Sequence, residues 1–116
     1  MARIRITEAD GIAALQAALG EQPSSADVAL AVRYTLQLLA ERAPGRAVEM
    51  RVPPFGAVQC IEGPTHTRGT PPNVIETDPE TWLALAMGRE RWGDALAAGR
   101  ISASGPRASL EEILPL

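Results

Sequence analysis

The clearest structural signal in the chain is the stretch from Asn73 to Gly88, which reads NVIETDPETWLALAMG. Its first five residues, up to Thr77, are typical of a strand. Asp78 and Pro79 then predict a helix start, because a carboxylate at the N-cap accepts a backbone N–H and proline fits the first helical position. Gly88 is typical of a helix end. The stretch therefore predicts a strand that leads directly into a capped helix.

The residues after Gly88 predict three short elements: a helix over 92–98 that stops at Gly99, a strand over 101–104 and a last helical turn near Ser109. Ser109 and Glu112 form a capping box. Glu111 and Glu112 would lie in the first turn of that helix, where the helix dipole favours carboxylates.

Two helices are predicted before residue 46. Thr7 and Asp10 form a near capping box for the first helix, which ends at Gly20. Ser24 or Ser25 caps the second helix, which runs over 26–43. The second helix has two faces, a polar stripe of Arg33, Gln37 and Glu41 at spacing four and an apolar face of Val28, Val32, Leu36 and Leu39.

The apolar period then changes to two. Val48, Met50 and Val52 alternate with less apolar residues, which predicts a half-buried strand. A second strand is predicted over 55–61 after two prolines. The order of helices and strands predicts an α+β domain rather than a βαβ series.

In the second predicted strand, Val58 and Cys60 face the same side. Phe55 has the opposite parity, unless Gly56 marks a bulge. We expect a single domain over 1–116, with 1–45 as its helical part and 46–116 as its sheet and C-terminal helices.

The composition excludes several classes of protein. The net charge is −3 and all 11 basic residues are arginine, so neither nucleic acid nor an anionic membrane surface is an expected partner. Four aromatic residues are too few for a base-stacking platform. One cysteine fits a reducing compartment, and no apolar run is long enough to insert into a membrane. We therefore expect a cytoplasmic protein.

The order of elements from Glu76 to Leu114 resembles the C-terminal half of sterol carrier protein type 2-like domains. The segment from Arg51 to Cys60 and the one from His66 to Asn73 look like the bacterial, mostly actinobacterial, branch of that family. The resemblance implies a sterol carrier-like fold, with a four- or five-stranded, mostly antiparallel sheet covered by helices on one face. The chain differs from the better-known lipid carriers by its extra N-terminal helices.

The resemblance also implies non-enzymatic binding of an apolar small molecule or lipid, such as an acyl chain, in a cavity between sheet and helices. The residues expected to line this cavity are Phe55, Val58, Cys60, Trp82, Leu83, Leu85, Ala86 and Trp92. The same apolar pattern is also typical of a filled core. The alternative is therefore a protein–protein interaction module or homodimer without a small-molecule ligand.

Residues 63–72 predict a polar loop between Gly- and Pro-containing ends. His66 and Arg68 in this loop are candidates for binding an anionic headgroup, although such loops also serve to satisfy their own backbone. One His and one Cys are too few for a typical metal site. Cys60 lies in an apolar strand where a thiolate is disfavoured, so we expect no catalytic residue and no cofactor.

Overall fold

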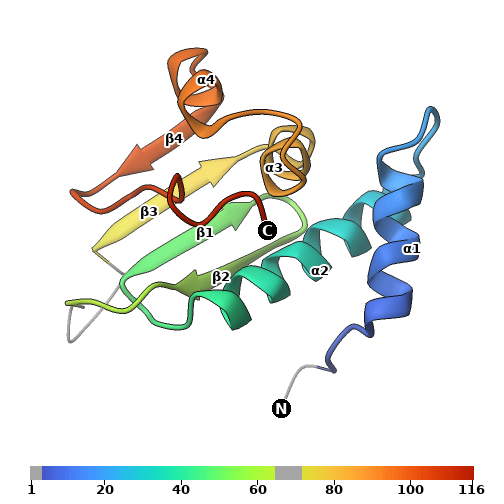
Figure 1. Cartoon of the computed structure of the whole chain (residues 1–116), viewed down its shortest axis with the longest axis horizontal. Coiled ribbons are helices and arrows are strands. Elements are labelled where there is room, and N and C mark those ends of the chain that lie inside the picture. The colour runs from blue at the N-terminus through green and yellow to red at the C-terminus, as the bar shows by residue number, and fades with distance from the viewer. Residues whose placement is uncertain (1–3, 65–71) are drawn as a thin grey trace.

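The computed structural model describes residues 4–64 and 72–116 and contains four helices and four strands in that part of the chain (Figure 1). The elements in chain order are α1 (Glu8–Ala18), α2 (Ser25–Arg42), β1 (Val48–Val52), β2 (Gly56–Cys60), β3 (Asn73–Thr77), α3 (Pro79–Ala86), α4 (Trp92–Ala97) and β4 (Ile101–Ser104). The predicted α+β class is confirmed.

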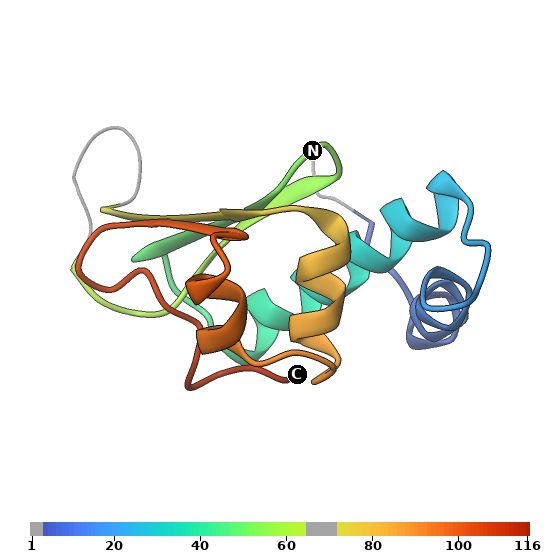
Figure 2. The same cartoon turned by 90° about the horizontal axis from the view of Figure 1, so that it is seen from above.

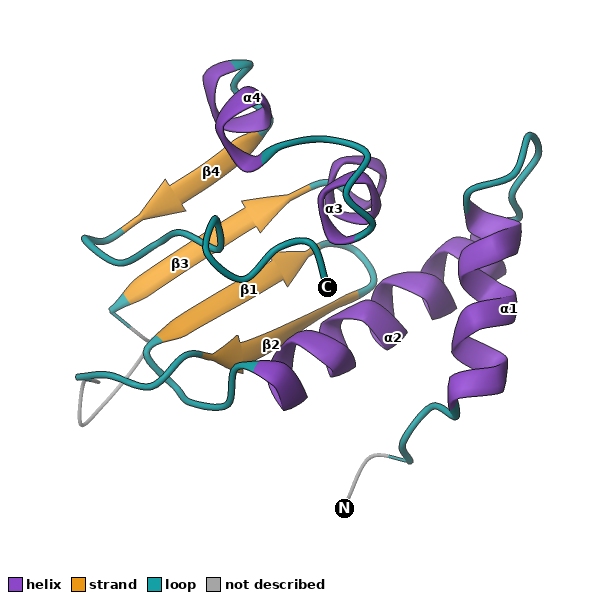
Figure 3. Cartoon of the chain, in the orientation of Figure 1, coloured by secondary structure: helices purple, strands orange, loops and turns teal. Residues whose placement is uncertain are grey.

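The four strands form one mixed sheet with the order β2-β1-β3-β4 (Figure 3). β1 pairs antiparallel with β2 and parallel with β3, and β3 pairs antiparallel with β4. Figure 2 shows α2, α3 and α4 on the same side of this sheet. The predicted mostly antiparallel sheet with helices on one face is therefore confirmed.

Alternation along the strands places one set of side chains under the helices. Val48, Met50 and Val52 of β1 are fully buried, while Glu49 and Arg51 between them are half-buried on the other face and bond to each other. The opposite face of the sheet is therefore the one left without helices.

Three of the predicted helix caps are confirmed. The side chains of Thr7, Ser24 and Asp78 accept backbone N–H groups at the starts of α1, α2 and α3. Each supplies an acceptor to a helix end whose first N–H groups lack an intrahelical partner. The pKa of Asp78 is lowered: partial burial raises it, but the Thr81 N–H and hydroxyl and the charge of Arg100 favour the carboxylate more strongly.

Helix α1 packs against α2 and lies away from the sheet (Figure 2). The contact is close because Gly11 of α1 faces the buried ring of Tyr34, which a Cβ at position 11 would overlap. Glycine at this position therefore sets how near the two helices can approach.

Two local expectations need adjustment. The second strand begins at Gly56 rather than at Phe55, which lies in the turn before it, and β1 and β2 pair one to one from Val52–Gly56 onward, so the open question of a bulge at Gly56 is answered in the negative.

The segment after Ser109 forms the predicted terminal turn over 111–113, in which the Leu114 N–H donates to the Leu110 carbonyl at 3.0 Å, but no longer helix. The Ser109 hydroxyl accepts from the Glu111 N–H at 3.2 Å, and not from the Glu112 N–H as in a capping box. A capping box marks only how a helix would start, and too few residues follow here to continue one.

Candidate functional site

Three of the residues predicted to line a cavity lie at the centre of the core. Trp82, Ala86 and Cys60 have no exposed surface. The Trp82 indole N–H donates to the Thr35 hydroxyl of α2 at 2.8 Å, and that hydroxyl donates to the Ala31 carbonyl. This buried pair satisfies the only polar group of the indole and connects α3 to α2.

The other predicted residues lie around this centre and line separate hollows. Leu85 and Trp92 line a hollow of about 600 Å³ beside the C-terminal segment, and Leu83 lines one of about 750 Å³ between α3 and the α1–α2 connection. Phe55 and Val58 line a third, at the edge of the sheet. The structure thus brings Phe55 and Val58 together but distributes the rest over the core and two other surfaces.

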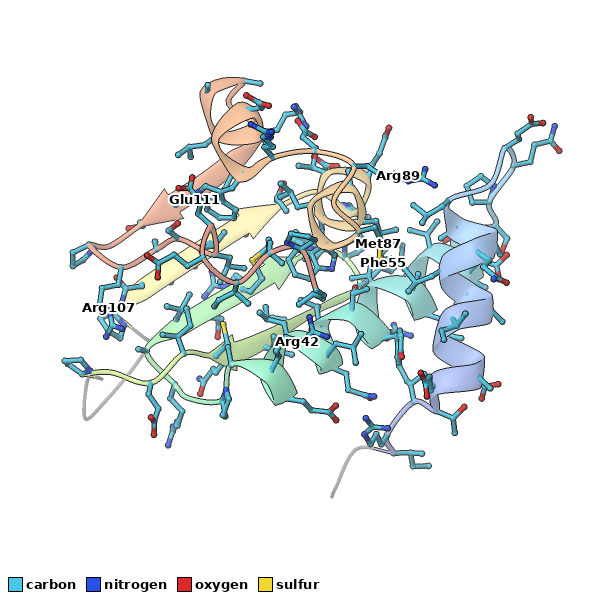
Figure 4. All side chains as sticks on the ribbon, in the orientation of Figure 1. Arg42, Phe55, Met87, Arg89, Arg107 and Glu111 are labelled. Atoms are coloured by element: carbon cyan, nitrogen blue, oxygen red, sulfur yellow. The ribbon has the colours of Figure 1, made fainter. Side chains whose placement is uncertain are left out.

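The third hollow is a groove of about 850 Å³ between α2, β2 and the N-terminal segment. Phe55 lies at the end of the β1–β2 hairpin, where the hairpin meets α2 (Figure 4). The apolar side chains that line the groove are Ile4, Ile6, Leu30, Leu36, Ala40, Phe55, Ala57 and Val58. Its charged side chains are Arg5, Arg33 and Glu41.

The polar stripe of α2 holds the walls of this groove in place. The Arg33 Nε donates to the Phe55 carbonyl at 3.1 Å and so ties the hairpin turn to the helix. One helical turn later, the Gln37 amide NH₂ donates to the Ile6 carbonyl and its oxygen accepts the Ile6 N–H, both at 2.9 Å. Glu41 accepts two hydrogen bonds from the Arg5 guanidinium.

The Arg5–Glu41 pair lies at the protein surface. The hydrogen bond and charge of Arg5 lower the pKa of Glu41, and Glu41 in turn raises the pKa of Arg5. The two opposite charges neutralise each other. Within the described lining, Arg33 therefore supplies the net positive charge.

The single cysteine, Cys60, is buried and is not expected to react as a nucleophile. Burial raises the pKa of Cys60 to about 11, so the side chain is a neutral thiol at physiological pH. Its sulfur lies on the helix-covered face of β2, in the core. In the described ranges, no three His, Cys, Asp or Glu side chains are grouped closely enough to hold a metal ion.

His66 and Arg68, the predicted headgroup residues, lie outside the described residues. The prediction for this loop stays a prediction.

The N-terminal segment is a part of the groove that was not predicted from the sequence. Ile4 and Ile6 line the groove, and the alternation Ile-Arg-Ile at 4–6 is a period-two pattern directly before a helix cap. That alternation is a signal for an extended segment with one apolar side. Its partner on α2 could not be identified from so short a pattern.

A comparison with protein families connects this geometry to known proteins. A family described as bacterial SCP ortholog, where SCP stands for sterol carrier protein, matches residues 24–116. The chain belongs to this family. The predicted relationship is thereby confirmed, and the matched range holds α2, the whole sheet, α3 and α4.

The match to the bacterial SCP family begins after α1, so the N-terminal segment and α1 lie outside it. No curated protein matches the chain. None of the helices in residues 4–64 and 72–116 is long and apolar enough to cross a membrane.

Proposed function

We propose that this protein is a non-enzymatic carrier that binds an acyl chain or a comparable apolar lipid in the groove between α2, β2 and the N-terminal segment. The observation that carries the proposal is the groove itself. It is lined mainly by aliphatic side chains and Phe55, and its volume of about 850 Å³ lies within the usual range of small-molecule sites, roughly 300–1,000 Å³. Membership of a sterol carrier family supports the same function.

Arg33 supports a ligand with an acidic end. The Arg33 Nε donates to the Phe55 carbonyl, which fixes the guanidinium at the groove. Among the described residues, Arg33 makes this one side-chain hydrogen bond, so its terminal nitrogens are available to a ligand. A carboxylate or phosphate is the partner that such a guanidinium binds best. The proposed orientation therefore places the apolar chain along Leu36 and Val58 and the acidic end at Arg33.

Burial of the chain supplies enough free energy without any catalytic group. Each methylene removed from water contributes roughly 0.8 kcal/mol, so a chain of about ten carbons gains on the order of 8 kcal/mol before the costs of ordering. Cys60, buried and protonated, offers no nucleophile to such a ligand. The function is therefore carriage rather than chemical conversion.

The interior residues predicted from the sequence form a second set of proposed ligand contacts, deeper than the groove. Trp82, Leu83, Leu85, Ala86, Cys60 and Trp92 remain candidates for ligand contact, and first contact is assigned to Phe55 and Val58. His66 and Arg68 remain candidates for a headgroup.

The test uses a matched pair of substitutions on neighbouring residues of β2. Val58 faces the groove, whereas Gln59 points to the opposite, exposed side of the strand. We expect Val58→Glu to weaken binding of the fluorescent fatty acid cis-parinaric acid at least tenfold, because the substitution places a charged carboxylate against the apolar chain of the ligand. Gln59→Glu adds the same charge and should leave binding unchanged.

Binding would be measured by fluorescence titration, with circular dichroism to show that both variants are folded. Native mass spectrometry of the purified protein would show whether a lipid is carried from the expression host. Equal binding by the two variants would place the ligand elsewhere.

The second candidate is an interaction module or homodimer without a small-molecule ligand. The observation that favours it is the complete burial of Trp82, Ala86 and Cys60, which fill the centre between sheet and helices. Met87, at the end of α3, and Leu96, in α4, are exposed apolar side chains and would contribute to a contact. A protein that binds no fatty acid and has the mass of a dimer would support this candidate.

A further inference from the structure

The N-terminal segment lies outside the residues that match the family, and it forms one border of the groove. Residues 4–6 lie outside the family match over 24–116, yet the half-buried Ile6 contributes an apolar side chain to the groove wall and the exposed Ile4 lies at its border. The α2 and β2 walls belong to the matched region. A feature that lies outside the family's range therefore determines how far the groove of this chain is enclosed.

Gln37 holds this segment through its backbone. Both polar groups of the Ile6 peptide, N–H and C=O, are bonded to the one side-chain amide at 2.9 Å. This pairing resembles one rung of a β-ladder and does not depend on the Ile6 side chain, which stays free to face the groove. The bonds are partly buried, so water competes with them less than at a fully exposed site.

The segment is anchored unequally at its two ends. On the C-terminal side Thr7 caps α1, and α1 is fixed to α2 by the close contact of Gly11 with Tyr34. On the N-terminal side the exposed Arg5–Glu41 pair adds a weaker anchor. Opening of the Gln37 bonds would therefore release residues 4–6 while the contact of α1 with α2 stays in place.

We infer that residues 4–6 form a strap that closes over an apolar ligand in the groove and slows its release, and that Gln37 is the residue that positions this strap. The inference rests on the proposed function, because it concerns the same groove. It goes beyond the proposed function because it assigns the residence time of the ligand to residues 4–6, which lie outside the family match. Closure of such a segment over a bound chain excludes water from it.

The test is Gln37→Leu, with Gln16→Leu on the exposed side of α1 as the matched control. Leucine keeps the size of the side chain, favours the helix and makes the groove more apolar. If Gln37 only lined the groove, the Gln37→Leu protein would therefore retain cis-parinaric acid as long as the wild type or longer. The strap predicts the opposite, a dissociation rate about tenfold faster in stopped-flow measurements, as expected for the loss of two partly buried hydrogen bonds. Gln16→Leu should release the probe at the wild-type rate.

Amide hydrogen exchange gives a readout that needs no ligand. In the wild type, the Ile6 N–H should be protected and should become more so when cis-parinaric acid is bound. Gln37→Leu should abolish this protection while amides in α1 stay protected. Unchanged Ile6 exchange in Gln37→Leu would overturn the positioning role of Gln37.

A second variant leaves α2 untouched. Arg5→Met removes the pair with Glu41 and keeps an apolar stem, so it should speed release by about twofold. If wild-type protein binds the probe and Val58→Glu abolishes this binding, but Gln37→Leu releases it at the wild-type rate, the strap is refuted and the carrier function stands. If wild-type protein binds no probe, the carrier function itself fails, and the strap with it.

Discussion

Helix α2 makes two contacts of different kinds on its opposite sides. On its buried side, Thr35 accepts the indole N–H of Trp82 in a contact that solvent does not reach. Two residues later, on the other side, Gln37 holds the backbone of Ile6 at the border of an open groove. The hydrogen bond between Trp82 and Thr35 stabilises the fold without competition from water. The bonds between Gln37 and Ile6 compete with water, so less free energy is needed to open them. Helix α2 thus separates a core that excludes water from a groove that is open to it.

The largest expected effect concerns the buried side. We expect Trp82→Ala to lower the free energy of unfolding by about 4 kcal/mol, because it leaves a large void and removes the partner of Thr35. Phe55→Ala, at the half-buried groove, should cost only about 1 kcal/mol. Urea unfolding followed by circular dichroism measures both.

If Trp82→Ala and Phe55→Ala lowered the free energy of unfolding by the same amount, the buried side and the groove side of α2 would contribute equally to stability, contrary to the prediction. Trp82→Ala also tests the interior ligand residues. If the chain of the ligand reaches Trp82, a folded variant should prefer longer fatty acids, and an unchanged preference would remove Trp82 from the site.

The next effect concerns the contact of α1 with α2, on which the strap depends. Gly11→Ala should destabilise the protein by about 2 kcal/mol, because the new methyl group overlaps the buried ring of Tyr34. Gly93→Ala in α4 is the control, since its Cβ would meet no atom closer than 4.0 Å, and alanine there should stabilise the helix by about 0.5 kcal/mol. Thermal unfolding of both variants decides the point. A Gly11→Ala protein as stable as the wild type would mean that α1 is not closely packed.

The smallest effect is the pH dependence of the strap's outer anchor. The hydrogen bond from Arg5 lowers the pKa of Glu41 in the folded state. The pair therefore contributes stability above the unfolded-state pKa of the carboxyl group, and this contribution is lost as the pH falls through the lower folded-state pKa. The contribution is small because both side chains are exposed.

Carbon-13 NMR of the carboxyl groups would follow this titration. The midpoint of Glu41 should lie below its ordinary value and rise toward it in Arg5→Met. Glu90, whose pKa is lowered by its own hydrogen bond with Arg100, should not change in that variant. A Glu41 midpoint that is the same with and without Arg5 would show that the pair is absent in solution.

Several elements could be predicted because their signals are local. Asp78 followed by Pro79 specifies a helix start through its own side-chain acceptor and ring geometry, and α3 begins there. The alternation of Val48, Met50 and Val52 marks a strand with one buried face, and β1 has these bounds. In such cases the residues that produce the element are also those that reveal it.

The groove could be predicted only in part. The sequence predicts Phe55 and Val58 for a cavity between sheet and helices, and the structure places both in the groove lining. The spacing of Arg33, Gln37 and Glu41 indicates only a polar stripe of α2. Spacing of four predicts that they share a face of the helix, which is correct. It does not show whether water or another segment meets that face, because the partners Ile6 and Phe55 lie far away in the chain.

The amino-acid order alone therefore specified the helix caps, the strand alternation, the α+β class and the relationship to the sterol carrier family, since each depends on neighbouring residues or on their succession. Long-range packing specified the rest. It buried Trp82 against Thr35, brought the N-terminal segment across α2 and separated Phe55 and Val58 from the other predicted ligand residues. These outcomes depend on which surfaces meet after the elements form, and side-chain type does not encode that choice locally.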